Sequence, residues 1–171
     1  MKSDATKRYE SLVKADIHAV WEFHSSAEAL RTLTPPNRNV KLLSSDLSVH
    51  EGAIHAFQVR VGPFRITWRA QLSAVDSPHG FLDTAVQSPF RTWTHKHEFI
   101  AHPDGTLIRD SIEYEVPFGI LGAVANRLFV SKEIDRLFAF RHRATAKALE
   151  GDGSIHNHRA LMKNLMKTPQ L

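Results

Sequence analysis

Two histidines separated by one residue, His95 and His97, lie in a segment in which apolar and polar residues alternate. Residues i and i+2 of a β-strand share a face, so both imidazoles are expected to point the same way. Asp110 lies in a second alternating segment, and a Pro-Asp-Gly-Thr turn at 103–106 joins the two. With Asp-Gly as a two-residue loop, the hairpin register places Asp110 diagonally across from His97.

Three kinds of chemistry fit this set. Two imidazole nitrogens and a carboxylate suit zinc or non-haem iron when all three converge. His97 and Asp110 can instead form an acid–base dyad, because a buried carboxylate orients an imidazole and raises its basicity. In a structural interpretation, the imidazoles only form hydrogen bonds to Tyr114, Asp110 or water. The spacing does not establish a clean third ligand, so we expect no metal, and since no cofactor fingerprint or glycine-rich phosphate loop accompanies the set, we expect no cofactor.

The hairpin that carries these residues has one aromatic face. A loop of Asp104 and Gly105 pairs Phe99 with Asp110 across the two strands. The face that includes these two residues consists of Trp93, His95, His97, Phe99, Asp110, Ile112, Tyr114 and Val116. The opposite face is polar, as a solvent-facing surface would be. An interior that is apolar with a few polar tips is typical of a small-molecule cavity.

The flanking segments predict a sheet followed by one long helix. A first strand is expected at 7–15, Asp16 is a candidate helix N-cap, and a second short helix is expected at 26–33. Further strands are expected at 39–46, 54–61, 64–74 and 81–87, and the alternation is clearest at 64–74. Apolar residues at helical spacing then run from 121 to 149, about 43 Å of helix. Since this helix must cover the aromatic face, we expect the sheet to bend around it and enclose a cavity.

Composition restricts the class of protein. A chain of 171 residues with 42% hydrophobic residues predicts one domain at 1–150 and a basic tail at 151–171. The absence of cysteine excludes disulfides and thiolate chemistry and fits a cytoplasmic location. Charges interrupt the first thirty residues, which argues against a secretory signal, and no apolar run is long enough to span a membrane. The net charge of +4 is spread along the chain, so we expect no nucleic-acid partner.

Five stretches carry a resemblance to a known family. They are Trp21-Glu22-Phe23, Trp68, the stretch 93–99, the stretch 110–119 and Phe138-Ala-Phe-Arg-His142. In this order they resemble the START-like superfamily, the polyketide cyclase/dehydrase or SRPBCC group, over residues 5–150. The Asp-x-x-x-Tyr-x-x-Pro pattern starting at Asp110 is the most characteristic part. The resemblance implies an α+β helix-grip fold: a curved antiparallel sheet of about six to seven strands around a long C-terminal helix, with two short helices after the first strand.

The resemblance also implies a hydrophobic pocket between sheet and helix, in many members without catalysis. We therefore expect a non-enzymatic protein that binds a hydrophobic or amphipathic small molecule, such as a lipid, a quinone or a polyketide. The expected ligand contacts are Phe57, Trp68, Trp93, His95, His97, Phe99, Asp110, Tyr114 and Phe138. One alternative is a cyclase or dehydratase with His97 and Asp110 as acid and base.

A second alternative is an interaction module that acts on a partner protein through the basic helix and tail. Arg141 and His142 on that helix either reach a polar ligand head group or form ion pairs at the surface. The tail from 154 to 171 either contacts an anionic membrane surface or a partner helix, or is a solvated terminus.

Overall fold

The computed structural model describes residues 5–61 and 63–150. These residues form one seven-stranded antiparallel sheet in the order β1-β7-β6-β5-β4-β3-β2. Its strands are β1 (Ala5–Val13), β2 (Val40–Leu42), β3 (Ile54–Val61), β4 (Phe64–Asp76), β5 (Gly80–Gln87), β6 (Thr92–His102) and β7 (Gly105–Glu115). From β2 to β7 each strand pairs with the next along the chain, and β1 returns to pair with β7.

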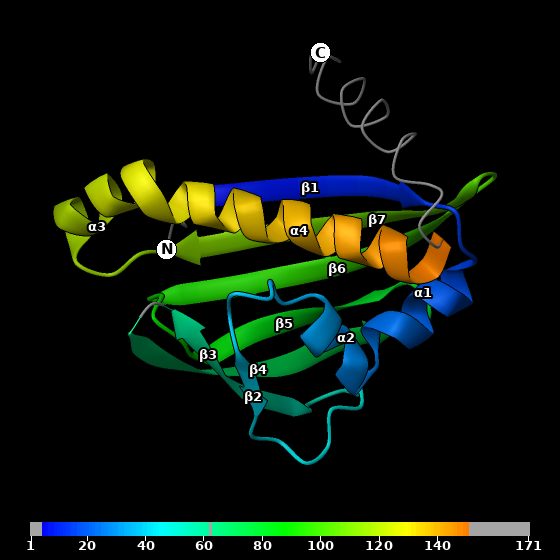
Figure 1. Cartoon of the computed structure of the whole chain (residues 1–171), viewed down its shortest axis with the longest axis horizontal. Coiled ribbons are helices and arrows are strands. Elements are labelled where there is room, and N and C mark those ends of the chain that lie inside the picture. The colour runs from blue at the N-terminus through cyan, green and yellow to red at the C-terminus, as the bar shows by residue number, and fades with distance from the viewer. Residues whose placement is uncertain (1–4, 62, 151–171) are drawn as a thin grey trace, which may run out of the picture.

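The helices lie in the connection between β1 and β2 and after the last strand. Between β1 and β2 come α1 (Ile17–His24) and α2 (Ala27–Thr32), and after β7 come α3 (Gly119–Ala125), the π-helical turn η1 (Asn126–Val130) and α4 (Ser131–Glu150). Figure 1 shows α3 to α4 as one long rod along the curved sheet. This arrangement confirms the expected α+β helix-grip fold. The rod begins at 119 rather than 121, and the π-helical turn interrupts its α-helical geometry.

Local sequence signals explain where the first helices begin. The Asp16 carboxylate accepts a hydrogen bond from the backbone N–H of His18 at 2.8 Å, which confirms the predicted N-cap. Ser26 caps α2 in the same way through the N–H of Ala29 at 3.1 Å.

The first strand runs two residues earlier than expected, and the strand expected at 39–46 is limited to β2. The tail expected at 151–171 lies outside the described residues, and within them no helix is long and apolar enough to cross a membrane.

The β6–β7 hairpin has a different register from the one expected. His97 pairs with Asp110, and Phe99 pairs with Ile108, a shift of two residues. Side chains alternate with a period of two along a strand, so this shift leaves every residue on its expected face. It also brings the carboxylate of Asp110 directly across from His97 instead of diagonal to it.

The turn itself explains the shift. Its two central residues are Pro103 and Asp104, and Gly105 already belongs to β7. Proline has its φ preset for the first central position of such a turn. Gly105 has φ of +140°, and a Cβ there would lie 2.1 Å from the carbonyl oxygen of Val13. The glycine is therefore required where β7 passes the end of β1, and it is not a loop residue.

The alternation predicted for 64–74 ends before the strand does. Ala74 has φ of +50° and is exposed, while Val75 packs against the core instead. The pairing of β4 with β5 shifts between Ser73 and Asp76, as at a β-bulge. At the other end of β4, Phe64 is exposed although it belongs to the apolar face.

The core is divided into two apolar clusters. One includes Val13, Phe99 and Ile108, and the other includes Trp93, Ile112, Tyr114 and Phe138. Each of β1, β5, β6, β7 and α4 contributes to both clusters. Between its two contributions, each element carries at least one polar side chain facing the interior. These side chains are Ser11, Asp83, His95, His97, Asp110 and His142, and we call them the polar layer.

Candidate functional site

Asp110 on β7 is the centre of the polar layer. Its Oδ1 atom lies 2.8 Å from His95 Nε2 and 3.2 Å from His97 Nδ1, and its Oδ2 atom lies 2.9 Å from His142 Nε2. The Ser11 hydroxyl lies 2.6 Å from His142 Nδ1, so β1 and α4 are joined to the same network. One buried carboxylate therefore connects β1, β6, β7 and α4.

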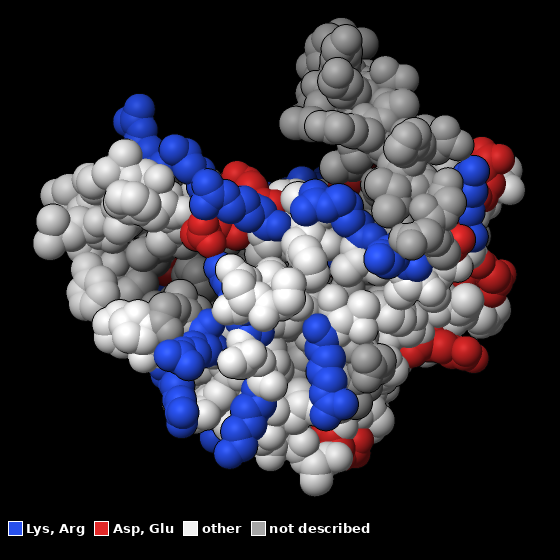
Figure 2. Space-filling model, viewed as in Figure 1, with Lys and Arg blue, Asp and Glu red and all other residues white. Residues whose placement is uncertain are grey.

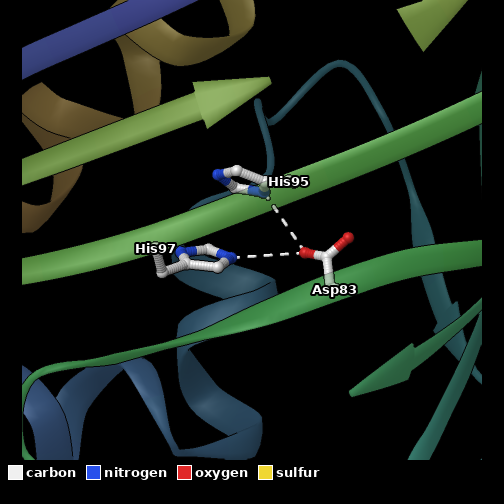
Figure 3. A group of neighbouring side chains, drawn as sticks. All are labelled: Asp83, His95 and His97. Carbon is white, nitrogen blue, oxygen red and sulfur yellow. Dashed lines mark hydrogen bonds and ion pairs between the residues drawn. The ribbon is translucent and has the colours of Figure 1, made fainter. Parts of the chain in front are cut away.

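Asp83 on β5 closes the network from the other side. It pairs with His95 across β5 and β6, and its Oδ2 atom lies 3.2 Å from both His95 Nδ1 and His97 Nε2. Figure 3 shows this oxygen directed between the two imidazoles. Each of the two rings thus lies between two carboxylates, with one ring nitrogen toward Asp83 and the other toward Asp110.

The charges in the polar layer stabilise one another. Burial lowers the pKa of His95, but attraction to Asp83 and Asp110 outweighs it and raises the pKa to about 9. Burial likewise opposes ionisation of Asp110, yet the charge of His95 and the hydrogen bonds from the imidazoles hold the pKa of this carboxyl well below its usual range. The pKa of Asp83 is lowered by His95 and His97 in the same way. At neutral pH and without a bound metal ion, His95 is therefore an imidazolium between two carboxylates.

The space beside the polar layer is small. A cavity of about 10 Å³ is lined by His97, Asp110, Arg141 and His142, together with His24 and other neighbours. This volume holds about one water molecule. Side chains from the sheet, α1 and α4 fill the rest of the layer at this point.

In the part of the chain that the structure describes, Arg141 and His142 on α4 do not form the surface ion pairs that one interpretation of the sequence expected. His142 is only 4% exposed and belongs to the polar layer, so it is not part of a surface ion pair. The Nε atom of Arg141 is buried and has no hydrogen-bond partner among the described residues. Its guanidinium carbon lies 5.3 Å from the centre of the Phe138 ring, and burial lowers the pKa of the side chain. Arg141 thus adds a partly desolvated cation beside the cavity.

The expected ligand-contact residues separate into three groups. His95, His97 and Asp110 belong to the polar layer, whereas Phe99 belongs to the apolar cluster beside α1. The remaining aromatic residues belong to the other apolar cluster or stack on it: Trp68, Trp93, Tyr114 and Phe138 are in the cluster, and Phe57 stacks on Trp68.

The aromatic end is held together by ring contacts. Trp68 meets Trp93 edge to face, with ring centres 5.2 Å apart, and stacks on Phe57 at 6.3 Å. Phe90, which the sequence analysis did not select, contacts Trp68 and Trp93 at 6.0 and 4.9 Å. The Tyr114 hydroxyl donates a hydrogen bond to Asn126 Oδ1 at 2.9 Å, which ties the sheet to η1. Of the partners that the structural interpretation offered for the imidazoles, Asp110 takes that role, at 2.8 Å from His95 and 3.2 Å from His97.

Large apolar side chains are exposed around this end. Phe118, Ile120, Leu121 and Phe129 expose 67–85% of their surface, and Phe64 on β4 exposes 70%. Figure 2 shows the surface hollowed between α3 and the end of the sheet where β4 begins. A folded chain rarely leaves so many large apolar groups together in water without a binding role. We call this region the apolar mouth.

Sequence reasoning missed Asp83 and Ser11 and misassigned His142. His142 follows Phe138 by four residues and precedes Thr145 by three, so the helical stripe already placed it on the buried face. Asp83 alternates with Phe81 and Ala85, which marks it as inward-facing once the strand is oriented. Ser11 gave no such signal, because both faces of its strand carry apolar residues.

Comparisons with known proteins agree on fold and family. Residues 13–141 match the family described as "Polyketide cyclase / dehydrase and lipid transport". No curated protein matches the chain. Among solved structures, Ms6760 from Mycobacterium smegmatis is 15% identical (TM-score 0.66; 84% of this chain and 90% of that one), and CV1439 from Chromobacterium violaceum is 13% identical (TM-score 0.68; 86% and 99%). TTHA0849 from Thermus thermophilus is 14% identical (TM-score 0.63; 84% and 99%). At these identities the structures support the fold alone, and it is the match over most of the chain that shows the family: this chain belongs to the polyketide cyclase/dehydrase and lipid transport family.

Proposed function

We propose that this protein binds one hydrophobic or amphipathic small molecule at the aromatic end of the layer between sheet and helix. The observation that carries the proposal is the apolar mouth, where large side chains of α3, η1 and β4 are exposed around a surface recess. The family description, which includes lipid transport, supports the same class of ligand.

The interior of this end offers suitable contacts. Trp68 is only partly buried, and Phe57, Phe90 and Trp93 surround it. Aromatic rings supply large apolar area at little cost in side-chain entropy. Burial of apolar surface contributes about 25 cal/mol per Å², so a ligand that covers the face of one indole gains a few kcal/mol before ordering costs.

The π-helical turn gives this end a means of adjustment. Residues 126–130 lie between α3 and α4, and Asn126 within this turn accepts the hydrogen bond of Tyr114. Such π-helical turns are rare and are frequent at functional sites. A displacement of α3 about this turn would widen the recess without disturbing the polar layer further along α4.

The acid–base alternative receives less support from the geometry. His97 and Asp110 do meet, with 3.2 Å between Nδ1 and Oδ1, and both line the small cavity. A substrate would have to bring its reacting carbon into space for about one water molecule. Asp110 also accepts from three imidazoles already, so its carboxylate is committed to the network. Binding at the aromatic end therefore accounts for more of the structure than catalysis at the polar layer does.

The first test is native mass spectrometry of the freshly purified chain, followed by extraction of any retained small molecule. The second is a fluorescence titration with the amphipathic probe 1-anilinonaphthalene-8-sulfonate. Trp68→Ala is expected to weaken probe binding about tenfold, which corresponds to a loss of about 1.4 kcal/mol. Trp21→Ala is the matched control, since Trp21 packs against Phe81 and Phe99 in the other cluster.

The two variants separate binding from stability. Both remove an indole from the core, so unfolding by urea measures the stability that each variant loses, separately from its effect on probe binding. Equal probe affinity in both variants, or a larger loss in Trp21→Ala, would contradict the proposed position of the site.

A further inference from the structure

Three ligand atoms converge from neighbouring strands in the polar layer. Asp83 Oδ2 lies 3.2 Å from His95 Nδ1 and 3.2 Å from His97 Nε2, and the three residues offer ligand atoms within 4.8 Å of one another. In a tetrahedral zinc site with bonds of about 2.0–2.1 Å, neighbouring ligand atoms lie about 3.3 Å apart. The two distances from Asp83 therefore already match edges of such a tetrahedron. Figure 3 shows the carboxylate oxygen facing the two rings from the adjacent strand.

Asp110 supplies what a metal-binding histidine normally has behind it. A ligating imidazole usually donates its other ring N–H to a carboxylate, which fixes the tautomer and orients the ring. Asp110 Oδ1 lies 2.8 Å from His95 Nε2 and 3.2 Å from His97 Nδ1, the two nitrogens that do not face Asp83. The other carboxylate oxygen is held by His142, which is held in turn by Ser11. The orienting carboxylate is thus fixed from two further elements.

This arrangement has a direct electrostatic consequence. When both neutral imidazoles donate to Asp110, their remaining lone pairs and the carboxylate of Asp83 all point into the same small volume. Lone pairs directed at one another in a buried site repel unless a cation lies among them. That cation is either a proton on a ring nitrogen or a metal ion, and binding of the metal releases the proton.

We propose that Asp83, His95 and His97 bind one divalent transition-metal ion, with Asp110 orienting both imidazoles. Two nitrogens and one carboxylate oxygen suit Zn²⁺ and its neighbours in the first transition row, and they disfavour Mg²⁺ and Ca²⁺, which prefer oxygen. Three protein ligands leave a fourth position for water or a ligand atom. The side chains of Asp83 and His97 are 18% and 12% exposed, so the site is not sealed from solvent. This inference is independent of the ligand bound at the apolar mouth.

The binding test uses the full chain after treatment with a chelator, titrated with Zn²⁺ alone by calorimetry. We expect one Zn²⁺ per chain. Because the chain has 11 histidines, binding at the surface is the competing explanation. His95→Gln is the variant in the site, and His79→Gln is the control, since His79 is exposed and forms a surface pair with Asp76 at 3.4 Å. His95→Gln should weaken binding at least about 100-fold, and His79→Gln should leave it unchanged.

A second measurement uses the wild-type chain, because substitution of the buried His95 can also prevent folding. Long-range ¹⁵N–¹H NMR spectra distinguish the two nitrogens of each imidazole. Addition of Zn²⁺ should shift His95 Nδ1 and His97 Nε2 and leave His79 unchanged. The proposal is overturned when no stoichiometric binding occurs, when His95→Gln folds and retains wild-type affinity, or when the NMR shifts fall only on other histidines.

Discussion

Asp110→Asn tests whether the polar layer is a charged network. The substitution keeps the shape of the side chain but removes the negative charge that faces the imidazolium of His95 and the ring of His97. His142 can adapt to the new amide by changing tautomer, because its other nitrogen faces the Ser11 hydroxyl. The main loss is therefore the charge. Removing one partner of a buried ion pair costs about 3–5 kcal/mol.

The pH dependence gives an independent magnitude. In the metal-free protein the pKa of His95 is raised from 6.5 to about 9. A raised folded-state pKa contributes stability that is fully present below pH 6.5 and is lost as the pH rises through about 9. A shift of this size corresponds to about 3 kcal/mol, to which both Asp83 and Asp110 contribute. Asp110→Asn should therefore reduce both the stability at pH 6.5 and its decline toward pH 9.

The assay is urea unfolding of chelator-treated protein, followed by tryptophan fluorescence at several pH values between 6 and 9.5. In thermal unfolding of the same proteins, a loss of this size in a chain of this length lowers Tm by roughly 6–20 °C. Asp104→Asn is the matched control: the same change, in an exposed turn residue, should alter stability by less than about 0.5 kcal/mol. A loss below about 1 kcal/mol in Asp110→Asn, with the wild-type pH slope retained, would refute the charged network.

Two further changes test single contacts. The pKa of His24 is lowered by burial to about 4, and its Nδ1–H donates to the carbonyl of Val20 at 2.8 Å. Wild type should therefore lose stability, relative to its value above pH 6.5, as the pH falls toward 4. His24→Leu should not show this decline in acid unfolding curves. Parallel curves for the two proteins would contradict the assignment. Gly105→Ala places a Cβ 2.1 Å from the carbonyl oxygen of Val13 at φ of +140°. The substitution should therefore lower the free energy of unfolding by about 1–3 kcal/mol, measured by thermal unfolding. An unchanged Tm would show that β1 can move aside.

The sequence predicted which side chains of β6 and β7 face the interior, but it did not predict which residues lie opposite one another across the two strands. The alternation in β6 and β7 identified the inward-facing residues correctly even though the register was shifted by two. Periodicity depends only on neighbours along one strand, whereas register depends on the turn and on contacts with other elements. Here the decisive contact is between Gly105 and the backbone of Val13, about 90 residues apart in sequence, and no local pattern reports it.

The same limit explains the incomplete candidate site. His95, His97 and Asp110 were recognised because a single hairpin brings them together. Asp83 and Ser11 join them only when β5 pairs with β6 and β1 pairs with β7. The amount of free space was also not predictable, since a pattern of apolar residues does not say how closely rings interlock. The edge-to-face contact of Trp68 with Trp93 fills volume that the alternation alone left undefined.

The polar layer gives little advantage to a domain that needs only a stable core. A buried ion-pair network is often no more stabilising than apolar residues of the same volume, because desolvation offsets the attraction. Here two carboxylates and three imidazoles divide an otherwise apolar interior, and the same elements contribute well-packed apolar residues on both sides. The fold therefore had apolar solutions available at these positions. A convergent set of nitrogen and oxygen atoms at that place is better explained by a cation that the layer binds than by the requirements of packing.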